Sequence, residues 1–89
     1  MIVQKAWGVE HILVNTSNYC AKKLVVSPMW RCSLHRHQFK HECFIVERGY
    51  GWLILNDDPI ELQPGVVVEV PAGAWHCFWN PCDPAPLVL

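Results

Sequence analysis

The 89-residue chain is poor in charge: charged side chains make up 17% of it, and its net charge is −1. An average globular protein has about 25% charged residues. Without a basic excess, the sequence gives no reason to expect nucleic acid or an anionic membrane as a partner. It also lacks an apolar run of the ~18 residues that a membrane span needs, and its start lacks the pattern of a signal peptide. We therefore expect a cytoplasmic protein.

The chain also lacks the paired cysteines of a disulfide framework. Its five cysteines form no Cys-x-x-Cys motif, and their number is odd. We expect reduced thiols that pack as small apolar side chains. A metal site that includes a cysteine is the minor alternative.

Apolar side chains, in contrast, are abundant. They make up 52% of the sequence, which includes five tryptophans. We expect one domain over residues 1–89, and so small a domain has a large surface for its volume and cannot hide all of these side chains. A homodimer would cover an apolar patch and a free sheet edge together. We therefore expect a homodimer.

No segment has a convincing helical pattern. Glycines and prolines interrupt the sequence at short, regular intervals, and the segments between them alternate or are continuously apolar, which is typical of an all-β protein. Many short strands with frequent turns indicate a sandwich or a closed barrel. The predicted strands cover residues 11–15, 19–26, 32–37, 42–47, 51–55, 60–62, 66–70, 76–80 and 87–89.

Two runs contain residues that can bind a metal ion. The first is His35-Arg36-His37, with Glu42 five positions further on, and the second extends from Gly65 to His76. Successive side chains of a strand point to opposite faces, so His35 and His37 should share a face and Arg36 should point away. Two imidazoles would then approach one ion.

These two runs, in this order, resemble the two motifs of the cupin family. The resemblance implies a small double-stranded β-helix, the jelly-roll-like barrel of cupins. It also implies a metal site in which Glu42 and His76 join His35 and His37. Such a mixed nitrogen and oxygen shell suits one divalent transition metal ion, namely Mn, Fe, Co, Ni, Cu or Zn.

Within cupins, the chain is most similar to the C-terminal cupin domain of type II mannose-6-phosphate isomerases. The similarity rests on Trp7-Gly8, the stretch from Ser33 to Glu42, Pro71-Ala72-Gly73 with His76, and Asn80-Pro81. The chain departs from that pattern at Met29, where a turn glycine is usual and where we expect a different or strained turn, and at His35, where those isomerases have Gln. The nucleotidyltransferase domain often fused to that cupin is not among the 89 residues, so we expect no nucleotide-sugar synthesis from them.

Two basic residues are candidates for binding a substrate anion. Arg31 has the same strand parity as His35 and His37, so regular alternation would place its guanidinium on the metal face, where it could bind a phosphate or carboxylate. A salt bridge at the strand end is the alternative. Lys22 shares the parity of Leu24 and Val26 and resembles a basic position of the isomerases, although many lysines are simply solvated.

Three functions fit these features. The first is a metal-dependent isomerase or epimerase of a sugar or sugar phosphate, for which the sequence offers only Glu61, Glu69 or a metal-bound water as a base. The second is a metal-dependent dioxygenase. The third is a non-enzymatic sensor or carbohydrate-binding protein, since a fold alone does not imply turnover. All three bind a small molecule, and the sequence does not name it.

Overall fold

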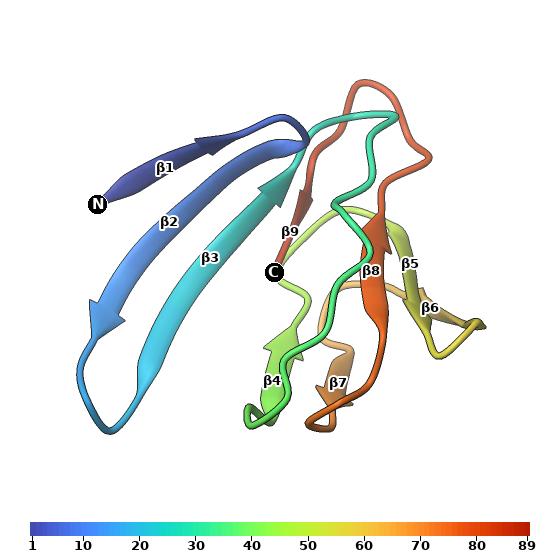
Figure 1. Cartoon of the computed structure of the whole chain (residues 1–89). Helices are drawn as coiled ribbons and strands as arrows, with labels where there is room; N and C mark the ends of the chain where they lie inside the picture. The colour runs from blue at the N-terminus through green and yellow to red at the C-terminus, as the bar shows by residue number, and fades with distance from the viewer.

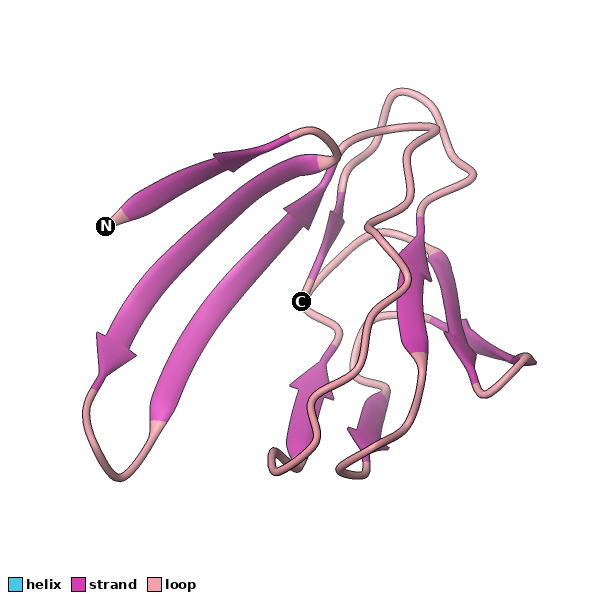
Figure 2. Cartoon of the chain, viewed as in Figure 1, coloured by secondary structure: helices cyan, strands magenta, loops and turns pink.

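Nine β-strands and no helix make up the computed structural model, which describes all 89 residues (Figure 2). The all-β prediction is confirmed. The chain forms no helix that could span a membrane. The strands are β1 (Ile2–Lys5), β2 (Gly8–Asn15), β3 (Cys20–Val26), β4 (Glu42–Ile45), β5 (Gly51–Leu55), β6 (Asp58–Leu62), β7 (Val67–Val70), β8 (His76–Trp79) and β9 (Leu87–Val88).

The strands form three antiparallel sheets, in the orders β1-β2-β3-β9, β4-β7 and β6-β5-β8 (Figure 1). The last strand, β9, pairs with β3 and so connects the long N-terminal sheet to the rest of the barrel. Strand β8 forms an edge of the three-stranded sheet, and the extended segment 31–35 lies beside it through two isolated bridges. This segment and β8 supply the three histidines of the predicted site.

The core lies where the inner faces of these sheets meet. Alternation places Leu53 of β5 and Phe78 of β8 inside, at 0% and 1% exposure, while their neighbours Trp52 and Trp79 face outward. The ring of Phe44 packs edge-on against that of Phe78, with 4.7 Å between centroids. None of the five tryptophans is buried, so apolar side chains remain at the surface as the composition predicts.

Most predicted strands are present, with ends shifted by a few residues, and β5 matches its predicted range. Strand β1 was not predicted. The strand predicted over residues 32–37 is wrong, because this segment makes only isolated bridges. Arg31 is opposite Trp79 and His35 is opposite His76. The segment therefore advances four residues, from Arg31 to His35, while β8 advances only three, from His76 to Trp79. The extra residue breaks the alternation, as a β-bulge does.

Turns follow the glycines that the sequence places between strands. Gly49, Gly65 and Gly73 have φ of 93°, 89° and 84°, a region that favours glycine. Met29 has φ of 65°, so the turn that lacks its usual glycine keeps a left-handed, strained residue. The buried Asn80 amide donates to the carbonyls of Val26 and Ala85 and accepts from the Cys82 N–H, which fixes the loop before β9.

Candidate metal centre

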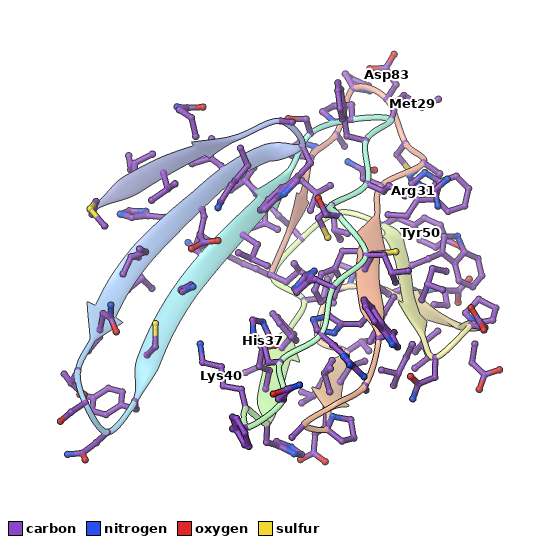
Figure 3. All side chains as sticks on the ribbon, in the orientation of Figure 1. Met29, Arg31, His37, Lys40, Tyr50 and Asp83 are labelled. Carbon is purple, nitrogen blue, oxygen red and sulfur yellow. The ribbon has the colours of Figure 1, made fainter.

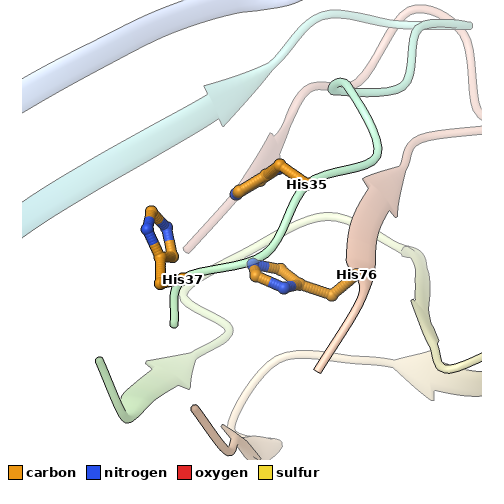
Figure 4. Close-up of side chains that lie close together, drawn as sticks. All are labelled: His35, His37 and His76. Atoms are coloured by element: carbon orange, nitrogen blue, oxygen red, sulfur yellow. The ribbon is translucent and has the colours of Figure 1, made fainter. Parts of the chain in front are cut away.

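Three imidazole rings converge at one end of β8 (Figure 4). His35 and His37 come from the loop before β4, and His76 is the first residue of β8. One ring nitrogen from each lies within 4.8 Å of the others. The ring centroids of His35 and His76 are 4.3 Å apart, and those of His37 and His76 are 6.0 Å apart. The predicted convergence of the three histidines is therefore present.

Backbone hydrogen bonds hold the histidines together in place of a regular strand. The His35 N–H donates to the His76 carbonyl at 3.0 Å, and the His76 N–H donates back at 2.9 Å. The N–H of Gly73 donates to the His37 carbonyl at 2.7 Å. The Pro71-Ala72-Gly73 turn thus fixes the chain at His37, while β8 fixes it at His35.

Two of the rings are oriented by the backbone. Nδ1 of His35 lies 2.7 Å from the Ser33 carbonyl, and Nδ1 of His76 lies 3.1 Å from the Ala74 carbonyl. A carbonyl only accepts, so each Nδ1 carries the proton and donates it. The Nε2 atoms are then left with their lone pairs free, which is the form that binds a metal.

Glu42, at the start of β4, completes the cluster. Its Oε1 lies 3.3 Å from His37 Nε2 and 3.6 Å from His76 Nε2. Despite these approaches, Glu42 Oε1 and His76 Nε2 are both buried without a hydrogen-bond partner. Buried polar atoms are almost always satisfied, so two that face each other without a bond fit a cation between them. The donor set of three imidazoles and one carboxylate suits a divalent transition metal ion.

The environment of His76 favours its neutral form. Burial lowers the pKa of this imidazole, because a charged ring would lose its hydration. The hydrogen bond to Ala74 raises the pKa, and His35 lowers it further. His76 is 1% exposed, whereas His35 and His37 are partly exposed. The cluster is thus closed on the β8 side and open on the loop side.

A shallow cleft of about 390 Å³ lies next to His37. It is lined by Arg36, His37, Gln38, Phe39 and Lys40. The Arg36 guanidinium carbon lies 4.9 Å from the centroid of the Trp75 ring, which holds this side chain in a cation–π contact. In Figure 3, Lys40 lies beside His37. The loop beside His37 therefore contributes two basic residues, Arg36 and Lys40, to the lining of this cleft.

The structure does not bring Arg31 to this cluster. The expected regular alternation is wrong, and Arg31 lies on the outer face of β8 with Trp79, opposite the face of His76 and Phe78. There its guanidinium contacts the Cys77 thiol. Figure 3 shows Arg31 and His37 on different sides of β8.

Lys22 shares the face of β3 that carries Val26, but it is exposed and already paired. Its Nζ is 3.0 Å from Glu10 Oε1 on β2. Sequence reasoning missed Arg36 and Lys40 as neighbours of the cluster. Arg36 was expected to point away from the histidines, and its guanidinium lies against the exposed Trp75 ring. No sequence pattern identifies the loop that places these two residues around His37.

The Cupin domain family matches residues 22–89, which is most of the chain. The chain belongs to the cupin family. Among solved structures, a cupin-2 domain protein from Shewanella frigidimarina superposes with a TM-score of 0.75 at 22% identity, over 97% of this chain and 78% of that one. The sheets described above are therefore those of a small cupin β-barrel.

Two further relatives concern sugar phosphates. A mannose-1-phosphate guanylyltransferase from Escherichia coli is 26% identical over 83 residues, which is 92% of this chain and 18% of that protein. The chain thus spans less than a fifth of that relative. A proposed sugar phosphate isomerase from Acidithiobacillus ferrooxidans superposes with a TM-score of 0.66 at 26% identity, over 75% of this chain and 44% of that one.

Proposed function

We propose that this cupin binds one divalent transition metal ion through His35, His37, Glu42 and His76. The observation that carries the proposal is the pair of buried, unsatisfied atoms Glu42 Oε1 and His76 Nε2 within a cluster of three imidazoles. Removing polar atoms from water without a partner costs several kcal/mol, on the order of 2–7 for a neutral group. A bound cation removes this cost.

The bound ion would supply Lewis acidity to a substrate oxygen. The protein's own part is to hold the ligands ready. The carbonyls of Ser33 and Ala74 keep the Nε2 atoms of His35 and His76 unprotonated, and burial keeps His76 neutral. Phe78 lies beneath His76, with 6.5 Å between ring centroids, and excludes water from the closed side.

The substrate class that we propose is a sugar phosphate, with an isomerase-like reaction. Two kinds of support point to it. The names of the relatives refer to a mannose phosphate and to a sugar phosphate isomerase. In addition, Arg36 and Lys40 line the cleft beside His37, where they can bind a phosphate while sugar hydroxyls reach the metal. Arg36 and Lys40 thus take the role that the sequence suggested for Arg31.

Titration of the metal-loaded protein with mannose 6-phosphate and with mannose tests this substrate class. We expect the phosphate to raise affinity about tenfold or more, since charge-assisted hydrogen bonds contribute ~1.5–3 kcal/mol each. In a Lys40→Gln/Arg36→Gln variant this gain should disappear, whereas Arg31→Gln should retain it. Equal affinity for both sugars in the parent protein would rule out a phosphate subsite here.

A second candidate is a sensor that binds its ligand without turnover, or an oxygenase. Neither needs a carboxylate base to move a proton. One observation favours it: neither glutamate considered as a base reaches the cluster. Glu61 accepts hydrogen bonds from Tyr50 and Gln63, and the Glu69 side chain is 71% exposed beside His41. Exchange of solvent deuterium into a bound sugar phosphate separates the candidates, because an isomerase that moves a proton incorporates deuterium and a sensor or oxygenase does not.

A further inference from the structure

The outer face of the β6-β5-β8 sheet carries a row of four side chains in cross-strand register. Trp52 is opposite Glu61 on one side and opposite Trp79 on the other, and Trp79 is opposite Arg31. Paired residues of antiparallel strands point to the same face. The row therefore reads Glu61, Trp52, Trp79, Arg31, with a negative charge at one end and a positive charge at the other.

This row faces away from the barrel core and from the histidines. Trp79 is 41% exposed, and Trp30, the residue before Arg31, is 51% exposed. Arg31 forms no ion pair within the chain, and Glu61 is bonded only to the neutral Tyr50 and Gln63. Figure 3 shows Arg31 and Tyr50 on the same side of β8. The two charged ends thus have no partner of opposite charge. Trp79 is exposed, and Trp52 is half-buried, with the Tyr50 ring edge-on against it at 6.2 Å between centroids.

We propose that this face is the surface on which a second copy of the chain packs. The order of charges is the argument. A two-fold axis that lies in the plane of the interface, parallel to the strands and midway between Trp52 and Trp79, packs two such faces together and brings Arg31 of each copy onto Glu61 of the other and the indoles onto one another. An isologous interface requires this kind of self-complementarity. Neighbouring strands are about 4.8 Å apart, so the row spans ~14 Å, and both ion pairs form at its ends.

The composition of the row also matches an interface centre. Tryptophan and arginine are enriched at sites that dominate binding energy, and large aromatic side chains there exclude water from the neighbouring charges. The metal ligands lie on the other side of the sheet, where β8 presents His76 and Phe78 inward. The interface would leave the metal site and its cleft accessible in both copies, so this inference stands independently of the proposed function.

Sedimentation equilibrium with charge-reversal variants tests the interface. The parent protein should be a dimer at micromolar concentration. Arg31→Glu and Glu61→Arg should each raise the dimer dissociation constant at least about tenfold, because each places two like-charge pairs across the two-fold axis. The double variant Arg31→Glu/Glu61→Arg should restore dimerisation. Lys5→Glu changes charge equally on the distant strand β1 and should have no effect.

Circular dichroism of each variant checks folding. Because Arg31 also contacts Cys77, Glu61→Arg alone, at an exposed position, decides the matter if Arg31→Glu does not fold. A monomeric parent protein would overturn the proposal, and so would a dimer that survives Glu61→Arg. If the parent is a monomer and an oligosaccharide quenches its tryptophan fluorescence, with loss of quenching in Trp79→Ala, the face is a carbohydrate platform instead.

Discussion

Glu42 Oε1 and His76 Nε2 lie 3.6 Å apart, and both atoms are buried without a hydrogen bond. Glu42 is paired with Val70 on β7, while His76 is paired with Leu55 on β5 and bridged to His35. Two separate sheets thus position a carboxylate and an imidazole against one another. A cation bound by both atoms, as proposed above, would satisfy them.

The metal-free protein should lose stability as pH falls. Burial lowers the pKa of His76 in the folded state, so the unfolded chain binds a proton more readily. The contribution of His76 to the free energy of unfolding is therefore complete above its unfolded pKa of about 6.5 and declines as pH falls below that value. Urea unfolding of chelator-treated protein between pH 8 and pH 5 measures this decline. His76→Gln should make it smaller, and an unchanged decline would contradict the burial argument.

The cysteines should differ in reactivity. Cys20 and Cys43 are exposed, whereas Cys32 and Cys77 are buried. Burial raises the pKa of Cys32 to about 11, which leaves almost no thiolate near neutral pH. Mass spectrometry after brief treatment with iodoacetamide should find Cys20 and Cys43 modified and Cys32 and Cys77 intact. Equal modification of all four would mean that the barrel opens on the timescale of the reaction.

Alkaline pH should destabilise the fold because the Cys32 thiol is buried. The folded pKa of Cys32 exceeds the ordinary value of 9.0, so its contribution to stability is complete below pH 9.0 and is lost as pH rises toward about 11. Thermal unfolding across this range measures the loss. Cys32→Ala should reduce its pH dependence, and Cys20→Ala, at an exposed position, is the matched control.

Replacing Asn80 should destabilise the barrel without removing the metal ligands. Its side chain is fully buried and makes three hydrogen bonds to the backbone of Val26, Ala85 and Cys82. Asn80→Ala leaves these groups unpaired, so we expect a loss of about 3 kcal/mol in the free energy of unfolding. Asn18→Ala, at an exposed turn, should change it by less than about 0.5 kcal/mol. Similar values for both variants would show that the amide is not a structural tie.

The sequence was sufficient to predict much of the fold, because alternation and turn residues act locally. Leu53 and Phe78 alternate with Trp52 and Trp79, and Gly49, Gly65 and Gly73 mark the turns. The bulge between Arg31 and His35 could not be predicted in this way. The bulge depends on which residues of β8 lie opposite Arg31 and His35. One extra residue in the segment places Arg31 on the outer face while His35 remains on the inner face.

The candidate site was predictable only in part for the same reason. His35, His37, Glu42 and His76 are recognisable as a motif, and the structure brings their side chains together. The surroundings of the motif depend on loop geometry. Arg36 and Lys40 lie in the loop that lines the cleft, and Arg36 also packs against Trp75. Neither position has a periodic signal in the sequence.

Elemental analysis of the purified protein tests the metal centre most directly. We predict about one transition metal ion per chain in the parent, since the cluster offers one set of converging ligands. His76→Ala and Glu42→Ala should each lose it, whereas His11→Ala, on β2 outside the cluster, should retain it. Full metal content in both ligand variants, or a parent protein that stays metal-free after dialysis against Mn, Fe, Co, Ni, Cu and Zn, would contradict the account.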